Sequence, residues 1–263
     1  MTEVVLITGA SAGIGKATAF AFAEQGSQLV LAARSAEPLK QVALELEQTL
    51  DAEVLAVPTD VTDPEQVSAL ISQALERFEQ IDIVVNNAGI CMSGPTVDST
   101  LEQWQQVMAV NFWGYVHVIR AVLPHLIERR KGQIVNVGSL GGKLPIPQMT
   151  AYCASKYAVA GLTEALRMEL AGHSIEVIGI HPGIVQSEFL QRAIFTDPVA
   201  GKAQMESALT GPFVNSSEEV AEALIQACRQ HKTDVTVGLS QLAVGAYRLF
   251  PELVTAALST VKS

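Results

Sequence analysis

The chain has few basic residues, with 17 Lys and Arg against 27 Asp and Glu among 263 residues and a formal net charge of −10. Nucleic acid is therefore not an expected partner, because an acidic surface without Lys/Arg clusters repels phosphodiester backbones. Its three cysteines, Cys91, Cys153 and Cys228, are odd in number and far apart, which favours a reducing compartment over a disulfide framework. The five histidines show no metal-ligand spacing and no Cys-x-x-Cys occurs, so no metal site is expected.

Long uncharged apolar runs are also missing. None reaches the roughly 18 residues of a membrane-spanning helix, and the first residues lack the basic and apolar regions of an export signal. We therefore expect a cytoplasmic protein without a transmembrane segment. With 49% hydrophobic and 17% charged residues, the chain has a globular composition and can bury a large core.

Short apolar runs alternate with longer stretches of helical periodicity along most of the chain. The runs that predict strands are 4–7, 28–31, 54–57, 81–85, 133–137, 176–180 and 234–237, and the stretches that predict helices are 14–24, 38–50, 64–78, 101–129, 151–170 and 217–229. Strands that alternate with helices predict an α/β fold with a doubly wound parallel sheet that is covered on both faces.

No linker, internal repeat or low-complexity segment divides the chain, so we expect one domain over residues 1–263. Two segments break the alternation. Residues 185–212 are too long for a plain connection and predict a substrate-binding insertion or lid. Residues 240–263 form a variable C-terminal tail, in which 241–261 is apolar with few charges and lacks the basic rim of a membrane-binding face.

A glycine-rich turn follows the first expected strand, with the sequence Thr8-Gly9-Ala10-Ser11-Ala12-Gly13-Ile14-Gly15. Such a turn lets the backbone approach a phosphate, and the following helix supplies free N–H groups. A nucleotide-triphosphate loop is excluded, because Ala10 stands at its first glycine and Ala17 at its hydroxyl position. A plain glycine-rich corner remains the alternative to a dinucleotide site.

Tyr152 and Lys156 lie four residues apart on an expected helix and therefore on one face of it. A phenol has a pKa of about 10, and a neighbouring ammonium lowers it toward the range that proton transfer needs. Considered alone, such a pair is more typical of an ordinary helix surface than of a catalytic site.

Together these motifs resemble the short-chain dehydrogenase/reductase family, in its single-domain branch with Thr-Gly-x-x-x-Gly-x-Gly and Tyr-x-x-x-Lys. The matches run from Thr8 to about Ser187 and include Asn86-Asn87-Ala88-Gly89, Asn111, Ser139 and Asp60-Val61. His181 to Ser187 resembles the family's Pro-Gly motif near the nicotinamide, with Ser187 where the family commonly has Thr. The resemblance implies a Rossmann fold and reversible hydride transfer between a nicotinamide dinucleotide and a carbonyl/alcohol pair.

The resemblance also implies a role for each matching residue. Tyr152 would be the acid/base, Ser139 would hold the substrate oxygen, Lys156 would lower the pKa of the tyrosine and bind the ribose, and Asn111 would support a water relay. Without the family, Ser139 could be a strand-end cap, Asn111 a buried amide and Asp60 an ordinary loop acid. The expected cofactor-binding residues are Gly9, Ser11, Gly13, Ile14, Gly15, Arg34, Ser35, Asp60, Val61, Asn87, Ala88, Gly89, Tyr152, Lys156, Pro182, Gly183, Val185 and Ser187.

The end of the second expected strand indicates which dinucleotide binds. An NAD enzyme places Asp or Glu there, whereas this chain has Ala33-Arg34-Ser35. A guanidinium suits a 2′-phosphate, so we expect NADP(H) in preference to NAD(H). Many NADP-preferring relatives carry a second basic residue where this chain has Ala12, and Lys16 is a poor replacement because it lies a turn along the helix.

We therefore predict an NADP(H)-dependent oxidoreductase. The alternatives are an NAD-dependent alcohol dehydrogenase, a sugar-nucleotide epimerase or dehydratase, and a regulatory protein that binds a dinucleotide without turnover. The epimerase branch has a different glycine spacing and a longer chain, and regulatory members often lose the Tyr or the Lys. The family also implies a homodimer or homotetramer built on the long helices.

Apolar residues in two segments predict a hydrophobic substrate. They are Pro145, Ile146 and Pro147 in the first segment and Phe189, Leu190, Ile194, Phe195, Met205 and Leu209 in the 185–212 insertion. These side chains could equally pack the insertion onto the domain or form a subunit contact. The remaining chemical-looking residues are expected to be structural, with His181 hydrogen-bonded at a strand end and Cys153 turned into helix packing.

Overall fold

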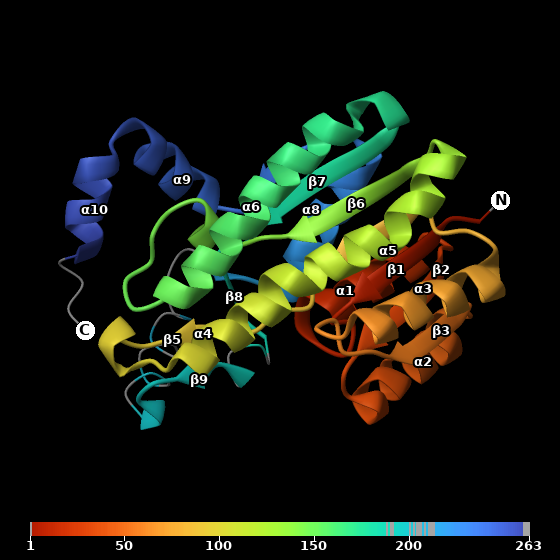
Figure 1. Ribbon diagram of the computed structural model, residues 1–263, viewed down its shortest axis with the longest axis horizontal. Coiled ribbons are helices and arrows are strands. Elements are labelled where there is room, and N and C mark those ends of the chain that lie inside the picture. The colour runs from red at the N-terminus through yellow and green to blue at the C-terminus, as the bar shows by residue number, and fades with distance from the viewer. Residues whose placement is uncertain are drawn as a thin grey trace.

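A parallel sheet with helices on both faces forms the centre of the molecule (Figure 1). The computed structural model describes residues 2–187, 189, 192–199, 201, 203, 207, 209 and 214–259. Within them the central sheet has seven strands, β1 (Val4–Thr8), β2 (Gln28–Ala33), β3 (Val54–Pro58), β4 (Ile83–Asn86), β6 (Gly132–Val137), β7 (Ile175–His181) and β11 (Asp234–Thr236). They coincide with the seven expected strands to within two residues at each end.

The strand order is β11-β7-β6-β4-β1-β2-β3, and every pair is parallel. The order reverses between β1 and β4, because β1 continues to β2 on one side and the later strands add on the other. This doubly wound Rossmann arrangement confirms the predicted fold class. A ligand crevice forms at such a reversal, outside the carboxyl ends of the strands.

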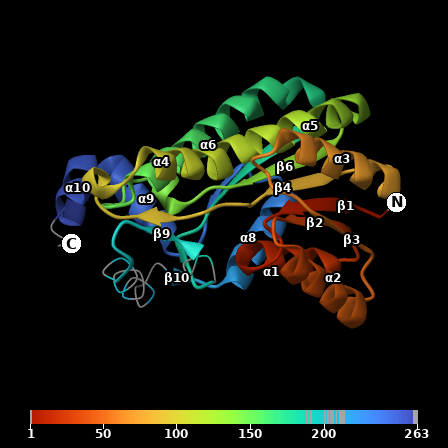
Figure 2. The same cartoon turned by 60° about the horizontal axis from the view of Figure 1, so that its bottom comes forward.

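Helices cover both faces of this sheet (Figure 2). One face carries α1 (Gly13–Ala23), α2 (Ala36–Leu50) and α8 (Ser217–Arg229), and the other carries α3 (Pro64–Phe78), α4 (Leu101–Met108), α5 (Gly114–Arg129) and α6 (Thr150–Leu170). Each β1 residue is buried, with Val5 and Ile7 in the core of the first layer and Val4 and Leu6 in that of the second. Burial on both faces explains why the strands are continuously apolar.

Side chains at the helix starts fix several boundaries. The Asp63 carboxylate accepts hydrogen bonds from the amides of Glu65 and Gln66, with Pro64 as the first residue of α3. Ser216 and Glu219 form a reciprocal capping box at the start of α8. These caps are local in sequence, so α3 and α8 begin at the predicted residues.

The expected helix 101–129 is interrupted by a π-helical turn, Ala109–Trp113, between α4 and α5. π-Helical turns are rare and often lie at functional sites. The whole stretch Leu101–Arg129 is long and apolar enough to cross a membrane, but 44% of its most apolar window is buried inside the molecule. A core helix meets the same criteria, so the stretch gives no support for a membrane span.

The tail that the sequence left without secondary structure contains two helices, α9 (Ser240–Leu249) and α10 (Pro251–Ser259). Figure 1 shows them at the end of the molecule away from the N-terminus. Pro251 starts the second helix and breaks the first, because a residue before proline avoids helical backbone angles. Val244, Tyr247 and Leu258 pack with Leu140 and Leu144 in a small apolar cluster.

Two short parallel ladders hold the insertion against the domain. β8 (Ile184–Val185) pairs with β10 (Val214–Asn215), and β5 (Met92–Ser93) pairs with β9 (Ile194–Phe195). The described part of the insertion is therefore tied at its base and again beside β5. Three short 3₁₀ turns, Thr96–Asp98, Leu140–Gly142 and Ala171–His173, complete the described elements.

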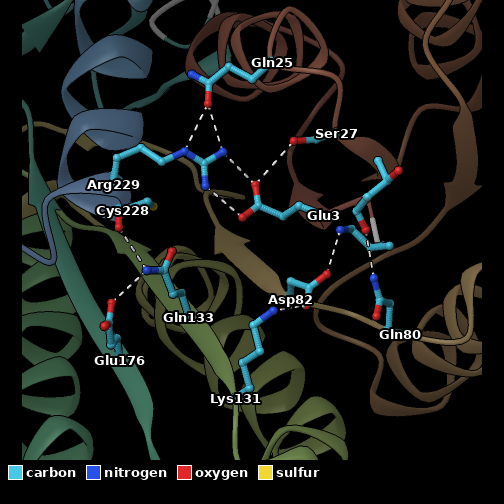
Figure 3. Close-up of polar contacts among 12 residues, drawn as sticks. Glu3, Gln25, Ser27, Gln80, Asp82, Lys131, Gln133, Glu176, Cys228 and Arg229 are labelled. Atoms are coloured by element: carbon cyan, nitrogen blue, oxygen red, sulfur yellow. Dashed lines mark hydrogen bonds and ion pairs between the residues drawn. The ribbon is translucent and has the colours of Figure 1, made fainter.

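Ion pairs and hydrogen bonds join the amino ends of the strands (Figure 3). The Asp82 carboxylate accepts from the Val4 amide at 2.9 Å and pairs with Arg129 at 3.0 Å, and Glu3 pairs with Arg229 at 2.8 Å. Charged side chains thus cross-link the amino ends of the strands, whereas a cleft lies at their carboxyl ends.

Candidate active site

One cleft of about 400 Å³ lies along the carboxyl ends of the central strands. Most of the site residues expected from the sequence line it, which brings together positions from Gly9 to Ser187. They are Gly9, Ser11, Gly13, Ile14, Arg34, Ser35, Asp60, Val61, Asn87, Ala88, Gly89, Ser139, Tyr152, Lys156, Pro182, Gly183, Val185 and Ser187. Gly15 and Asn111 do not line the cleft, and both support residues that do.

The three glycines of the β1–α1 turn serve different purposes. A Cβ on Gly15 would lie 2.3 Å from the Gly9 carbonyl oxygen, so Gly15 is required for the turn to pack on itself. Gly9 has φ +67° and its Cβ would collide with Ala88, and Gly13 has φ +52° beside Ser187. The packing explains Gly9 and Gly15 without a ligand, whereas Gly13 combines a positive φ with a place in the cleft wall.

The first turn of α1 faces the cleft without a capping side chain. Its N-cap is Ala12, which offers no side-chain acceptor, whereas α3, α4 and α8 are capped by Asp63, Thr100 and Ser216. No acidic residue lies in that turn of α1 either. Uncapped amides at a positive helix end form a site for an anionic group such as a phosphate.

Asn87 joins the ends of β1 and β4 beneath the cleft. Its Nδ2 donates to the carbonyl oxygens of Thr8 and Gly9 at 3.0 and 3.2 Å, and its backbone amide donates to Thr8 Oγ1 at 3.0 Å. The Ala88 amide donates to the same hydroxyl at 3.1 Å. These bonds hold the glycine turn, residues 8–15, against the segment 87–89. The two segments together form one side of the cleft, which we call the glycine floor.

Asp60 is the one carboxylate among the described residues that line the cleft. Its Oδ1 accepts from the amide and the hydroxyl of Thr62 at 2.9 and 2.8 Å. The neighbouring Val61 is buried, and its carbonyl oxygen is 2.9 Å from His117 Nδ1. Both residues, which are expected to bind the cofactor, are thereby held in place directly after β3.

Ser139 and Tyr152 meet at the end of β6 and the start of α6. Both side chains line the cleft, each residue is 7% exposed, and the Ser139 hydroxyl is close enough to lower the pKa of the Tyr152 phenol. Ser139 Oγ also accepts from the Gly141 amide at 3.1 Å, which fixes its rotamer. Two hydroxyls that face one cleft and differ in acidity can both bind one substrate oxygen.

Lys156 lies one turn after Tyr152 on α6 and is 4% exposed. Its Nζ donates to the Val137 carbonyl oxygen at 2.9 Å and lies 6.0 Å from the centre of the Tyr152 ring. Burial lowers the pKa of Lys156 from 10.5 to about 8. The Val137 oxygen also accepts from Tyr115 Oη at 2.9 Å, so the lysine is held by a carbonyl that has a second donor.

The pKa of Tyr152 differs from the sequence prediction. Burial of the phenol raises its pKa above the ordinary value of 10, although the neighbouring Ser139 hydroxyl acts in the opposite direction. The expected lowering by Lys156 is not produced by the protein groups alone, because the lysine is itself desolvated and directs its ammonium to Val137.

Asn111 lies in the π-helical turn and is fully buried. Its Oδ1 accepts from the Ile90 amide at 2.8 Å, and its Nδ2 donates to the Ile90 carbonyl and to Ser155 Oγ at 2.9 and 3.0 Å. The side chain therefore fastens the cleft wall at Ile90 to α6. Its part in a water relay remains a prediction. Because the side-chain amide already forms these three hydrogen bonds, the backbone of Asn111 would have to bind the water.

The short-chain dehydrogenase family model matches residues 3–197 of this chain, about three quarters of its length. The chain belongs to the short-chain dehydrogenase/reductase family. Dehydrogenase/reductase SDR family member 7B of Bos taurus is 34% identical over 257 residues, which cover 95% of this chain and 78% of the relative.

Two solved structures give the same result in three dimensions. A short-chain dehydrogenase/reductase from Burkholderia phymatum in complex with NAD has a TM-score of 0.87 at 30% identity, covering 96% of this chain and 95% of that one. One from Sphingobium yanoikuyae in complex with NADPH has a TM-score of 0.80 at 30% identity, with 99% and 97% covered. This short-chain dehydrogenase/reductase is therefore an oxidoreductase with a nicotinamide dinucleotide cofactor, and the glycine floor and uncapped α1 fit that cofactor.

In this oxidoreductase the sequence did not identify several residues of the cleft wall. They are Thr59, Ile90, Cys91, Ser93, Gln106, Val110 and Leu140. Thr59, Ile90 and Cys91 follow the ends of β3 and β4, so the rule that parallel strands present their carboxyl ends to the ligand could have found them. Gln106 comes from α4, whose approach to the cleft is not visible in the sequence.

The expected structural roles of His181 and Cys153 agree with their contacts. His181 Nε2 is 2.8 Å from Asp234 Oδ1, which confirms a hydrogen-bonded residue at the end of a strand. Cys153 is buried beside the Ile146 carbonyl and does not line the cleft. Among the described residues, no group of His, Cys, Asp and Glu could hold a metal ion.

Proposed function

We propose that this enzyme interconverts a hydrophobic ketone or aldehyde and its alcohol, with NADP(H) as the preferred cofactor. The observation that carries the chemistry is that Ser139, Tyr152 and the buried Lys156 line one cleft together with the glycine turn. A dinucleotide-binding regulatory protein would have no need of this arrangement.

The protein's part in the reaction is to orient the carbonyl and to supply one proton. When bound, the nicotinamide supplies the hydride in reduction and accepts it in oxidation. Ser139 Oγ and Tyr152 Oη donate hydrogen bonds to the carbonyl oxygen, which draws electron density from the carbon. As the carbon gains the hydride, the oxygen takes the Tyr152 proton, and the charge of Lys156 stabilises the resulting phenolate.

Arg34 and Ser35 support the preference for NADP(H). Both are exposed at the cleft directly after β2, and Arg34 forms no hydrogen bond or ion pair with any residue that the structure describes. Lys16, in contrast, pairs with Glu45 at 2.7 Å, so it does not provide a second cation. Arg34 is therefore the group that would bind a 2′-phosphate, through paired N–H donors.

Exchange of the β2 terminus tests this preference. Ala33→Asp combined with Arg34→Gln should weaken NADPH binding by about 10- to 100-fold, because a charge-assisted contact is lost and a repulsive carboxylate is added. NADH binding should improve. Steady-state KM values for both cofactors measure the effect, and Lys16→Gln is the matched control that should leave their ratio unchanged. A wild type that already prefers NADH would contradict the proposal.

The substrate end of the cleft supports an apolar substrate. Its described wall is formed by Ile90, Cys91, Val110, Leu140, Ile146, Pro147, Met149, Phe189 and Ile194, with Ser93, Gln106 and Arg192 as polar members. The Phe189 ring centre is 6.4 Å from that of Tyr152, so an apolar group on the carbonyl carbon would contact it. Pockets of this kind orient the substrate with a few polar groups and bind it through apolar walls.

The sequence-predicted insertion residues divide into three groups. Phe189 and Ile194 line the cleft, whereas Phe195 and Leu209 do not. Leu190 and Met205 lie outside the described residues. The proposal of a hydrophobic substrate therefore depends on Phe189 and Ile194 together with the 146–149 segment, and packing of the insertion accounts for Phe195, which contacts Gly201.

A ketone series of increasing alkyl or ring size tests the substrate class. We expect kcat/KM to rise by roughly fourfold for each buried methylene until the cleft is filled, in line with about 0.8 kcal/mol per methylene. Phe189→Ala should flatten the rise, and Phe195→Ala is the control. A flat series, with faster turnover of anionic or sugar substrates, would exclude the hydrophobic substrate and leave the oxidoreductase class intact.

We also propose a homo-oligomer that uses the outer faces of α4 to α6. Leu101, Trp113, Tyr157 and Met168 lie on this side and are 43% to 81% exposed. Large apolar side chains of this kind are enriched at subunit interfaces.

A further inference from the structure

Asp234, the first residue of β11, connects two segments that are distant in the sequence. Its Oδ1 is 2.8 Å from His181 Nε2 and 3.0 Å from Lys143 Nζ, and its Oδ2 is 3.2 Å from the same ammonium. The side chains of His181 and Lys143 are 1% and 6% exposed. A carboxylate with two buried partners from different elements acts as a cross-link between them.

Both partners directly adjoin the catalytic site. Lys143 follows the short turn Leu140–Gly142, which begins after Ser139, and His181 precedes Pro182 and Gly183 in the cleft wall. The same two segments are joined on the cleft side, where the Leu140 amide donates to the Pro182 carbonyl at 2.7 Å. Asp234 thus joins the segments of Lys143 and His181 on the side away from the cleft, whereas Leu140 and Pro182 join the same segments on the cleft side.

The His181 ring packs against the backbone that carries the catalytic groups. A Cβ on Gly138 would lie 2.4 Å from His181 Nδ1 and 2.8 Å from Cε1. Gly138 lies between Val137, whose carbonyl binds Lys156, and Ser139. Its own amide donates to Ile180 at 2.7 Å. A rotation of the imidazole would therefore displace the anchors of both the lysine and the serine.

The bond to Asp234 is the one hydrogen bond that orients this ring. His181 Nδ1 is buried without a partner among the described residues, so only Nε2 is held. Burial lowers the pKa of His181, which keeps the ring neutral with its proton on Nε2 facing the carboxylate. Although burial acts against ionisation of Asp234, its hydrogen bonds with His181 and Lys143 hold the pKa of Asp234 well below its ordinary value.

We propose that Asp234 is a positioning residue for catalysis, whose carboxylate fixes His181 and Lys143 and thereby the placement of Ser139 and Lys156. None of Asp234, His181 and Lys143 lines the cleft, so the effect is transmitted through the backbone. The expected effect of Asp234 on kcat rests on the proposed function. Its expected effect on the backbone around Ser139 rests on the geometry alone.

Substitutions of Asp234 should lower kcat in a graded way. Asp234→Ala removes both contacts and should reduce kcat by about tenfold or more, because small displacements of catalytic groups are costly. Asp234→Asn keeps an acceptor for the His181 Nε2–H and should lose less. The dissociation constant of the dinucleotide should change by a smaller factor than kcat, since the glycine turn that binds the rest of the dinucleotide is untouched.

Glu176→Gln is the matched control. It alters another carboxylate–histidine pair on β7, Glu176 Oε1 with His231 Nδ1 at 2.6 Å, which lies near the opposite, amino end of the strand and is exposed. This variant should retain the kcat of the wild type. Thermal melting of all variants separates loss of fold from loss of placement, and Asp234→Asn provides the test if Asp234→Ala does not fold.

Hydrogen–deuterium exchange gives a readout that does not depend on activity. The amides of Gly138 and Leu140 should exchange about tenfold faster in Asp234→Ala than in the wild type, and Glu176→Gln should not alter them. Unchanged exchange overturns the proposal, and so does faster exchange with an unchanged kcat or a lower melting temperature as the sole effect. A wild type without activity on carbonyls would instead count against the proposed function. The exchange rates would still show whether Asp234 fixes the backbone at Gly138 and Leu140.

Discussion

Tyr152→Phe should lower turnover by at least about 10²-fold, because the phenyl ring fills the same space and has no proton to donate. The hydroxyl that is lost lies against Ser139 in the cleft wall. The dissociation constant of NADPH, measured by fluorescence titration, should stay nearly unchanged, since the glycine turn and α1 are not altered. Turnover is measured through the absorbance of the reduced cofactor on the best substrate of the series.

Tyr157→Phe is the control for this change. Tyr157 is the next tyrosine on α6 and does not line the cleft. Loss of its hydroxyl should leave turnover within about twofold of the wild type, because the ring that packs on the surface of α6 is kept. Near-wild-type turnover of Tyr152→Phe would falsify the assignment of Tyr152 as the acid.

Lys156→Met should reduce turnover by about 10²-fold or more and leave the fold at least as stable at neutral pH. The ammonium is the buried charge that would stabilise the Tyr152 phenolate, so its removal affects the chemical step. The Val137 carbonyl, which loses the lysine, keeps the hydrogen bond from Tyr115 Oη. No acceptor is therefore left without a partner, and methionine fills the space of the lysine stem.

The stability difference between the two proteins should depend on pH. The pKa of Lys156 is about 8 in the folded protein and 10.5 in the unfolded chain, so the unfolded state binds more protons between these values. The destabilisation by Lys156 is complete below pH 8 and diminishes as the pH rises toward 10.5. Lys156→Met should thus gain most in melting temperature near pH 7 and lose that advantage by pH 10.

Calorimetric melting of both proteins at pH 7 and pH 10 measures this change. Comparison of the two proteins cancels the titration of Cys228, whose pKa burial raises to about 12. A variant that melts well below the wild type at pH 7 would show that the lysine supports the fold and would contradict the expected trade-off between function and stability.

Local sequence determined most of the secondary structure and the identity of the chemical groups. The expected helices 64–78 and 217–229 coincide with α3 and α8 because their caps, Asp63 and Ser216, act on amides two or three residues away. Apolar runs predicted all seven central strands, because strands that are buried on both faces are continuously apolar in sequence. The glycine turn and the Tyr-x-x-x-Lys pair are also short motifs, which is why the resemblance to the family was visible before the fold.

The tertiary structure decided the features that depend on distant segments. Gln106 enters the cleft through the packing of α4, and the π-helical turn occurs where Asn111 meets Ile90. The two helices of the tail pack around Leu140 and Leu144, which the sequence does not link to them.

The sequence by itself therefore determined which residues could carry the reaction. The fold determined how deeply they are buried and how their pKa values shift. A phenol beside an ammonium suggests a lowered pKa, yet burial raises that of Tyr152, because desolvation is set by all the atoms around the group. The contact between Asp234 and His181 spans 53 residues, and no local pattern encodes it. Spacing along the chain specifies chemistry and local structure, whereas burial and long-range pairing arise only when the strands assemble.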